Sequence, residues 1–268
     1  MRSPRVSVVV CTYNRAGLVS EAITSVLRQT FSDFELIIID DGSTDDTENA
    51  VRRAGDALRV KYLRVAHSAH LSRLRNAGIA RSRGALIAFL DSDDLWCEDK
   101  LAVQIRYLDS HSEAGFTVSG YEVFNSAGVQ RTKLYCEDNT RDDVTVRCIF
   151  DRLIRGEVTL CSSSIVFRRT LIERTGPLNE SLRTGDYEFY TRLAWESPAM
   201  IIHLPLVRVR QHEGNASAGV FSAAGLEEAI FAVERFHSLG AIGSDVRSRC
   251  LAKYTQELAE MRGEMVSN

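Results

Sequence analysis

The chain has 268 residues, of which 44% are hydrophobic and 26% charged, the composition of an ordinary globular protein. Its formal net charge of −3 at pH 7 gives no reason to expect nucleic acid or an anionic membrane surface as a partner. The apolar runs are much shorter than a membrane span, and the first one ends at Thr12 without a cleavage-like site. We therefore expect neither a transmembrane anchor nor a signal peptide.

The six cysteines are scattered along the chain, without a Cys-x-x-Cys pair or neighbouring histidines. This spacing supports neither a zinc site nor a disulfide framework. We expect free, mostly buried thiols in a reducing cytoplasm.

The first ninety residues alternate between apolar runs and stretches of helical periodicity. We expect strands at residues 6–11, 34–39, 60–65 and 85–90. We expect three helices between these strands. The first has residues 19, 22, 23, 26 and 30 on one face, and the other two cover residues 43–54 and 71–81. This alternation predicts an α/β fold with a mostly parallel, doubly wound sheet. No glycine-rich dinucleotide fingerprint or P-loop follows the first strand.

The second half of the chain has a mixed pattern. Residues 125–141 are polar and carry no clear assignment. The expected helices are 96–108, 144–154 and 186–195, and the expected extended segments are 116–124, 163–167 and 200–210, the last interrupted by Pro205. Two helices follow from residue 223, with Gly240 and Gly243 between them. Their apolar stripes indicate core packing or a homodimer contact.

Two acidic turns follow strands of the predicted sheet. Asp40 and Asp41 end the second strand, and Asp91-Ser92-Asp93-Asp94 ends the fourth. Ligands of open α/β sheets bind at this end of the strands, where one or two carboxylates plus substrate phosphates commonly hold Mg²⁺. Neither turn is an EF-hand, because the glycine position of that loop holds Trp96 or Asp46. A solvated acidic turn or a helix N-terminus is the alternative for the tetrad.

Four sequence blocks in this order resemble the inverting family 2 glycosyltransferases, which have the GT-A fold. They are residues 8–15 (VVVCTYNR), 39–44 (IDDGST), 75–78 (RNAG) and 89–96 (FLDSDDLW), with a weaker likeness from Ser163 to Ser217. The resemblance implies an enzyme that transfers a sugar, with inversion, from a nucleotide-diphosphate donor, with a UDP-sugar favoured. The acceptor would be a hydroxyl of a glycan, a lipid-linked glycan, a peptide or a small molecule.

The resemblance also implies a domain plan. Residues 1–110 would bind the donor, residues 111–217 would bind the acceptor and supply the base, and residues 218–268 would form a helical extension. The segment 125–157 and the extension, which are least like the family, would set acceptor specificity. A membrane-bound acceptor would be reached peripherally, at the inner face of the membrane.

The donor site follows from the same blocks. Thr12 and Tyr13 would line the nucleobase pocket with Asn14 and Arg15 beside them, while Asp41 would accept the imide N–H of uracil or thymine and Asp40 would support the turn. The loop residues His67 and His70 would lie close to the nucleotide. Arg75 and Asn76 would border the ribose or the phosphates; a surface arginine and a helix-capping asparagine are the alternatives.

The tetrad would be divided among several roles. Asp91 and Ser92 would lie on the nucleotide side, Asp93 would ligate Mn²⁺ or Mg²⁺, and Asp94 would be a supporting residue or a helix cap. His212, in Arg210-Gln211-His212, would be a metal ligand or a structural histidine. The metal would stabilise the diphosphate leaving group.

The catalytic base would be Asp186, which matches the aspartate of a Glu-Asp pair in the family. Here Gly185 replaces the glutamate, and Glu188 is a less favoured substitute base. A plain N-cap role is the alternative for Asp186. Trp96 and Trp195 would be acceptor platforms or, more in keeping with their type, core residues.

Two rival functions follow from the same features. A sugar nucleotidyltransferase would need a basic, glycine-rich loop after the first strand, which this chain lacks. A non-catalytic nucleotide-sugar-binding protein that has lost its base stays open because of Gly185.

Overall fold

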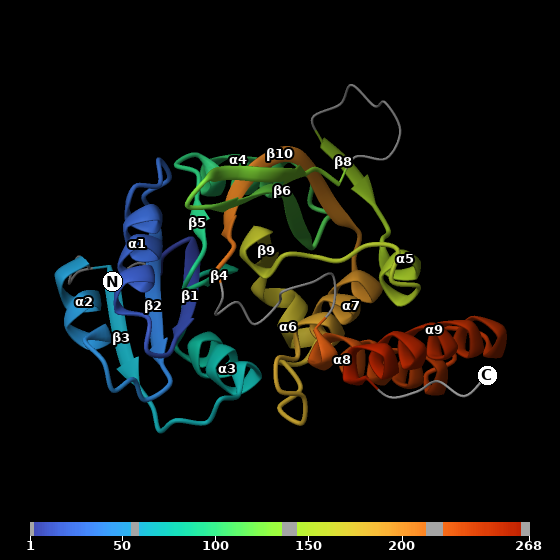
Figure 1. The fold of residues 1–268 in the computed structure, drawn as a ribbon. Helices are drawn as coiled ribbons and strands as arrows, with labels where there is room; N and C mark the ends of the chain where they lie inside the picture. The colour runs from blue at the N-terminus through green and yellow to red at the C-terminus, as the bar shows by residue number, and fades with distance from the viewer. Residues whose placement is uncertain (1–2, 55–58, 136–143, 213–221, 264–268) are drawn as a thin grey trace.

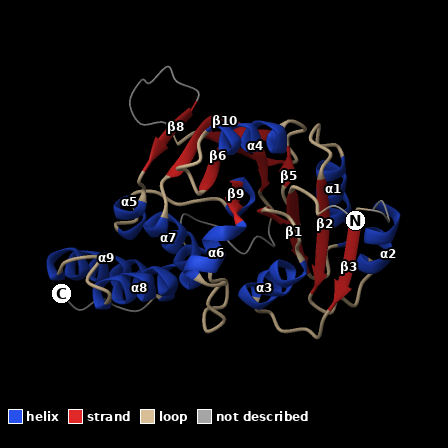
Figure 2. Ribbon diagram, turned by 180° about the vertical axis from the view of Figure 1, so that it is seen from behind, coloured by secondary structure: helices blue, strands red, loops and turns tan. Residues whose placement is uncertain are grey.

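The computed structural model describes residues 3–54, 59–135, 144–212 and 222–263. Its centre is a mixed sheet with strand order β3-β2-β1-β4-β9-β6-β10-β5, to which β7 adds beside β6 and β8 beside β10. Helices cover the sheet, and the last two helices lie side by side at the end of the molecule away from β1–β3 (Figure 1; Figure 2 shows the opposite side).

The first half of the chain confirms the predicted doubly wound arrangement. Strands β3, β2, β1 and β4 are all parallel, in the register Val6↔Phe34 and Val6↔Leu86. The elements of this half are β1 (Val6–Thr12), α1 (Ala16–Leu27), β2 (Phe34–Asp40), α2 (Thr47–Ala54), β3 (Val60–Arg64), α3 (Leu71–Arg81) and β4 (Leu86–Asp91).

The side chains of β1 alternate between two cores, as the period of a strand requires. Val8 packs with α1 on one face of the sheet, whereas Val9 packs with α3 on the other. Helix α3 approaches β1 closely at Gly78, where an added Cβ would lie 2.3 Å from a methyl carbon of Val9. Thr30 does not continue the buried face of α1, because that helix ends at Leu27 and Thr30 is exposed.

The second half departs from the prediction at three places. Residues 144–154 are not one helix, because Val144–Arg147 form the edge strand β8, antiparallel to β10. Trp96 belongs to the short strand β5, not to a helix. Helix α6 was not expected. The elements are β5 (Leu95–Trp96), α4 (Lys100–Ser110), β6 (Phe116–Asn125), β7 (Gly128–Lys133), β8, α5 (Phe150–Ile154), β9 (Ile165–Arg168), α6 (Arg169–Thr175), α7 (Asp186–Glu196) and β10 (Ala199–Arg210).

Strand β9 joins the two halves of the sheet. It runs antiparallel to both β4 and β6, and a 3-10 turn over Ser162–Ser164 precedes it. This arrangement brings the 162–164 turn to the end of β4 that carries the acidic tetrad.

The C-terminal extension consists of α8 (Ala223–Ser238) and α9 (Ser244–Arg262). The apolar stripe of α8, which includes Leu226, Val233 and Phe236, is buried in the main core against α5 and α7. The stripe therefore serves the core of the protein. No helix within the described residues is long and apolar enough to cross a membrane.

The described cysteines are free, as expected, but most are not buried. Cys250 is buried and Cys148 is exposed, whereas Cys11, Cys97 and Cys161 are partly exposed. The expectation of mostly buried thiols is therefore wrong. Cys136 lies outside the described residues.

Candidate active site

The carboxyl ends of β1, β2 and β4 meet at one edge of the sheet. A backbone hydrogen bond of 2.9 Å from Asp41 to Thr12 joins the loops that follow β1 and β2. Asn14 strengthens this joint, because its side-chain oxygen accepts from the N–H of Thr44 at 2.7 Å and its own N–H donates to the hydroxyl of Ser43 at 2.8 Å. Asn14 thus fixes the loops themselves, in a left-handed backbone conformation that asparagine tolerates (φ 48°).

The two aspartates that end β2 have different surroundings. Asp40 is fully buried and supports the turn, as predicted, by accepting from the N–H of Ser43 at 2.8 Å and from the hydroxyl of Tyr62. Asp41 accepts from the N–H groups of Ser68 and Ala69, both at 2.8 Å, and from the side chains of Ser68 and His67. These four donors occupy the lone-pair sites of the carboxylate, so a base imide would have to replace one of them.

Tyr13 and His67 form an aromatic pair beside Asp41. Their rings are stacked with centroids 4.1 Å apart, and both side chains are nearly half exposed. Thr12 beneath them is buried, and its hydroxyl oxygen has no hydrogen-bond partner within the described residues. His70 is the last residue of the loop before α3, as predicted, and occupies the N-cap position of that helix.

Asp93 is the carboxylate of the tetrad on which other functional groups converge. Its Oδ2 atom lies 2.8 Å from Nη1 of Arg15 and 3.0 Å from Nε2 of His212. The Ser92 hydroxyl lies 3.4 Å from the same guanidinium nitrogen. The structure thus brings together the loop after β1, the tetrad and the end of β10.

The residues at Asp93 fit a divalent cation that shares its ligands with a substrate. A carboxylate oxygen beside an imidazole nitrogen is a donor set suited to Mn²⁺, and Mg²⁺ commonly adds substrate phosphates to one or two carboxylates. No group of three or more His, Cys, Asp or Glu side chains placed to hold a metal occurs among the described residues. An ion held by Asp93 and His212 would take substrate phosphates or water as further ligands.

Asp94 is a structural residue, although not a helix cap. It is buried, accepts from the Ser163 hydroxyl at 2.7 Å and accepts from the N–H of Arg210 at 3.1 Å. Burial and the charges of Asp91 and Asp93 raise the pKa of Asp94 well above its usual range. The Ser163 hydroxyl also accepts the N–H of Asp91 at 3.1 Å, so one serine holds both ends of the tetrad.

Arg75 links the tetrad to the predicted base. It is 2% exposed, so the alternative of a surface arginine is wrong. Its guanidinium donates to Oδ1 of Asp91 at 2.9 Å, pairs with the carboxylate of Asp186, and lies over the ring of Phe89 at 4.9 Å. A buried cation between two carboxylates satisfies the rule that buried charges are paired.

Asp186 is the first residue of α7, and its side chain does not cap that helix. The N-cap position belongs to Gly185, which has a left-handed backbone (φ 70°). The carboxylate of Asp186 instead faces Arg75 and accepts from the Ser162 hydroxyl at 3.0 Å. The capping alternative is therefore wrong, and the side chain lies beside Arg75, which also binds Asp91 of the tetrad.

Two other candidates have structural partners. Glu188 is fully buried, and both of its carboxylate oxygens accept from Arg192, at 2.8 and 2.9 Å. It therefore cannot reach a substrate as a substitute base. Asn76 does not cap α3 but bonds the backbone of Leu178 in both directions, at 2.9 and 3.0 Å, and the side chain of Glu180 at 2.9 Å.

The two tryptophans have different surroundings. Trp96 is a core residue, 4% exposed, whose indole N–H donates to the carbonyl of Ser163 at 2.8 Å. Trp195 is 49% exposed and packs against Phe150 and Phe236 at the end of α7 opposite Asp186. The acceptor-platform hypothesis therefore fails for Trp96 and stays a prediction for Trp195.

Ser162 and Ser163 are site residues that the sequence analysis missed. Ser162 contacts the predicted base, while Ser163 holds Asp91 and Asp94. A detectable signal was present, because a run of three hydroxyl residues (162–164) directly precedes an apolar strand. Such a run places short hydrogen-bonding side chains at a sheet end.

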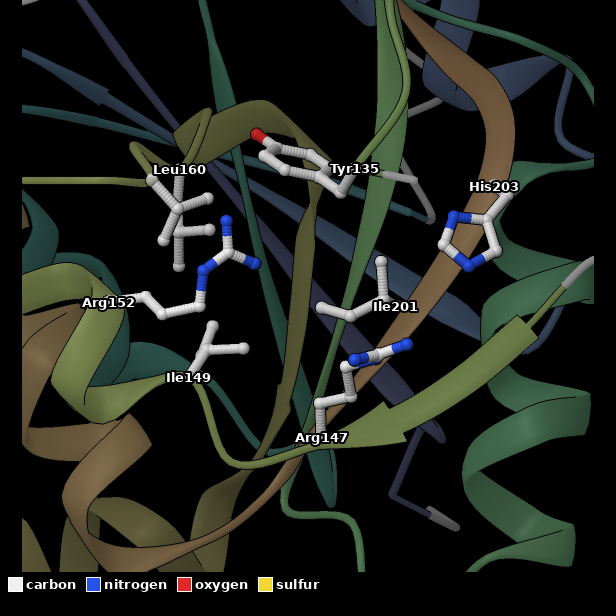
Figure 3. Close-up of a pocket in the computed structure, with 8 residues that line it drawn as sticks. Tyr135, Arg147, Ile149, Arg152, Leu160, Ile201 and His203 are labelled. Carbon is white, nitrogen blue, oxygen red and sulfur yellow. The ribbon is translucent and has the colours of Figure 1, made fainter. Parts of the chain in front are cut away.

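A small pocket lies in the second half of the chain, between β8, β10 and α5 (Figure 3). Arg147 and His203 line it from the two strands, Arg152 from α5, and Tyr135 and Leu160 close another side. Its volume of about 10 Å³ is room for one water molecule, far too little for a sugar. Tyr135 connects this pocket to the serine run, because its hydroxyl accepts the N–H of Cys161 at 3.3 Å.

Comparison with curated proteins identifies relatives of this chain. An uncharacterized glycosyltransferase of Rickettsia felis is 38% identical over 128 residues, which are 48% of this chain and 21% of that protein. The Escherichia coli UDP-Glc:alpha-D-GlcNAc-diphosphoundecaprenol beta-1,3-glucosyltransferase WfgD is 35% identical over 124 residues, which are 46% of this chain and 48% of that protein. The chain thus spans less than half the length of these two relatives.

Solved structures share the fold. Staphylococcus aureus TarS 1–349 in complex with UDP-GlcNAc has a TM-score of 0.69 at 22% identity, covering 96% of this chain and 71% of that chain. The mannosyltransferase PcManGT of Pyrobaculum calidifontis, with GDP-Man and Mn²⁺, has a TM-score of 0.66 at 20% identity, covering 97% and 71%. These neighbours confirm the predicted GT-A architecture. The family model described as Glycosyl transferase family 2 matches residues 7–175, so the chain belongs to glycosyl transferase family 2.

Proposed function

We propose that this glycosyltransferase moves a sugar from a nucleotide-diphosphate donor, with UDP-sugars favoured, to an acceptor hydroxyl, with inversion and with a divalent metal. The observation that carries the proposal is the row Asp93–Asp91–Arg75–Asp186. It places a carboxylate suited to a metal and a carboxylate suited to a base on the two sides of one buried arginine. TarS with UDP-GlcNAc and PcManGT with GDP-Man and Mn²⁺ support the donor class and the metal.

Residues 1–110 form the donor site in this proposal. The exposed Tyr13 ring offers a stacking surface for the nucleobase. Asp41 lies beside it, and the imide N–H of the base would replace one of the donors that bind its carboxylate. Arg15, which contacts Asp93, adds a positive charge where the diphosphate would lie. The acceptor would bind against residues 111–217, the half that supplies Asp186.

Asp93 and His212 would hold the Mn²⁺ or Mg²⁺ ion. When bound, the ion supplies positive charge that stabilises the diphosphate as the bond to the sugar breaks. Arg15 assists by hydrogen bonding to Asp93 and by its own charge. The hydrogen bonds of Ser163 with Asp94 and Asp91 fix the conformation of the tetrad.

Asp186 would take the proton of the acceptor hydroxyl as that hydroxyl attacks the anomeric carbon from the face opposite the diphosphate. Its ion pair with Arg75 favours the deprotonated carboxylate, which is the form able to act as a base. The Ser162 hydroxyl holds the second carboxylate oxygen and so orients the side chain.

The two halves of the site are tested separately. UDP release from a panel of UDP-sugars would be measured with Mn²⁺ for the wild type, Asp93→Asn, Asp186→Asn and the surface control Asp245→Asn. We expect Asp93→Asn to lose turnover together with the Mn²⁺-dependent thermal shift by UDP, whereas Asp186→Asn keeps that shift and loses turnover.

Three results would contradict the proposal. Full turnover by Asp186→Asn would exclude this residue as the base. A UDP thermal shift in the wild type that is indifferent to Mn²⁺ and to EDTA would exclude the metal at Asp93. Binding of a UDP-sugar by the wild type without release of UDP, with every acceptor class tested, would instead support a non-catalytic binding protein.

A further inference from the structure

The N-terminus of α7 is capped by a carboxylate from a different helix. Glu228 of α8 is 2% exposed, and its Oε1 atom accepts the N–H of Gly185 at 2.7 Å and the hydroxyl of Thr184. Its Oε2 atom accepts the N–H of Tyr187 at 3.1 Å. The carboxylate thus binds the backbone on both sides of Asp186.

This contact explains why the side chain of Asp186, at the start of α7, is not needed to cap that helix. The first N–H groups of a helix have no partner within the helix, and a carboxylate there is stabilised by the helix dipole. Glu228 satisfies these groups from α8, so the side chain of Asp186 is left to face Arg75 and Ser162.

The backbone conformation of Gly185 gives a reason why the capping carboxylate comes from α8 and not from position 185 itself. Its φ of 70° is unfavourable for side chains other than glycine, and an added Cβ would lie 3.2 Å from Cβ of Ser72. A glutamate at position 185 would therefore strain this turn. Helix α8 is in turn held rigidly, because Leu226 and Ala229 on either side of Glu228 are buried in the core.

We propose that Glu228 is a positioning residue for the base Asp186, so that the C-terminal helical extension forms part of the active site. The inference rests on the proposed function of Asp186. The charged groups around Asp186 are Arg75 from α3, with Asp91 of β4 on its other nitrogen, and Glu228 from α8. The phenol of Tyr190 on α7 and the thiol of Cys11 on β1 are further titratable groups beside Arg75 in the described part of the chain.

The test compares Glu228→Gln with Glu227→Gln, a change to the neighbouring exposed glutamate that pairs with Arg262 on α9. Glutamine keeps the size of Glu228 but places an NH₂ group against one backbone donor. We expect Glu228→Gln to keep its affinity for UDP and Mn²⁺ and its KM for the donor, while kcat falls about 10- to 100-fold through displacement of the base. Glu227→Gln should behave as the wild type.

The pH dependence separates positioning from mere capping. Loss of the negative charge of Glu228 should lower the pKa of Asp186 and move the acidic limb of the kcat profile to lower pH. The same shift is measurable without an acceptor, by ¹³C NMR titration of the side-chain carboxyl signal that Asp186→Asn lacks. Glu228→Asp, which keeps the charge, should restore part of kcat in the folded protein.

The proposal is overturned if folded Glu228→Gln keeps wild-type kcat, or if its Asp186 carboxyl titrates as in the wild type. It is also overturned if kcat falls only in proportion to the folded fraction measured by circular dichroism. Full activity of Asp186→Asn would instead refute the proposed function. Inactive Asp186→Asn with fully active Glu228→Gln would refute the positioning role alone.

Discussion

Lys100, at the start of α4, is a fully buried amine. Its Nζ donates to Oε1 of Gln104 at 2.5 Å and lies 4.0 Å from the ring centre of Trp96. Gln104 in turn donates to the carbonyl of Ser164 at 2.8 Å, in the 162–164 turn beside the candidate active site. Burial lowers the pKa of Lys100 to about 7, because a charged amine is poorly solvated there.

The sign of the resulting pH effect follows from proton binding. Between pH 7 and the unfolded pKa of 10.5 the unfolded chain holds the proton and the folded chain does not, so stability rises with pH. Below pH 7 both states are protonated, and the contribution becomes constant. Integration between these two pKa values predicts that the free energy of unfolding gains about 2 kcal/mol from pH 7 to pH 9 through this one residue.

Urea unfolding of the wild type and of Lys100→Met at pH 6, 7, 8 and 9 tests this expectation. The difference between the two proteins cancels the other titrating groups, and Lys253→Met, which removes an amine bonded to backbone carbonyls at the surface, is the control. Lys100→Met should lack the gain of about 2 kcal/mol, whereas Lys253→Met should keep it. Parallel pH profiles for the wild type and Lys100→Met would refute the assignment of a neutralised, buried lysine.

Two further substitutions test the packing and charge of the site. Arg75→Met should lower the free energy of unfolding by about 3 kcal/mol, at the low end for a broken buried ion pair because Asp91 is partly hydrated. The substitution should also raise the pKa of Asp186, which a ¹³C NMR titration would detect. Urea unfolding identical to that of the wild type would contradict the expected loss of stability. Gly78→Ala places a methyl group 2.3 Å from Val9 and should cost about 1–3 kcal/mol in thermal unfolding, whereas Ala77→Gly, one residue earlier in α3, should cost about 1 kcal/mol or less. A stabilised Gly78→Ala protein would show that α3 does not pack on β1 as closely as the structure has it.

Local sequence pattern predicted the first half of the chain well. Each strand there is a short apolar run and each helix has its own apolar stripe, so residues 71–81, for example, form α3 as predicted. In the second half the pattern was less decisive. Val144 and Val146 alternate as in a strand, but their strand state depends on pairing with Ile202 and Met200 of β10. Trp96 likewise becomes a strand residue only through its antiparallel partner Val207.

The sequence by itself determined the α/β class, the four motif blocks and the acidic tetrad at the end of β4. These features are local, because they depend on periodicity and on residue types within one element. Only the tertiary structure decided which carboxylate meets which partner. Arg75 joins Asp91 to Asp186, and Glu228 reaches Gly185 across 43 residues, so that Asp186 no longer caps its own helix. These contacts depend on how α3 packs against the sheet and how α8 packs against α7, and no spacing along the chain records that packing.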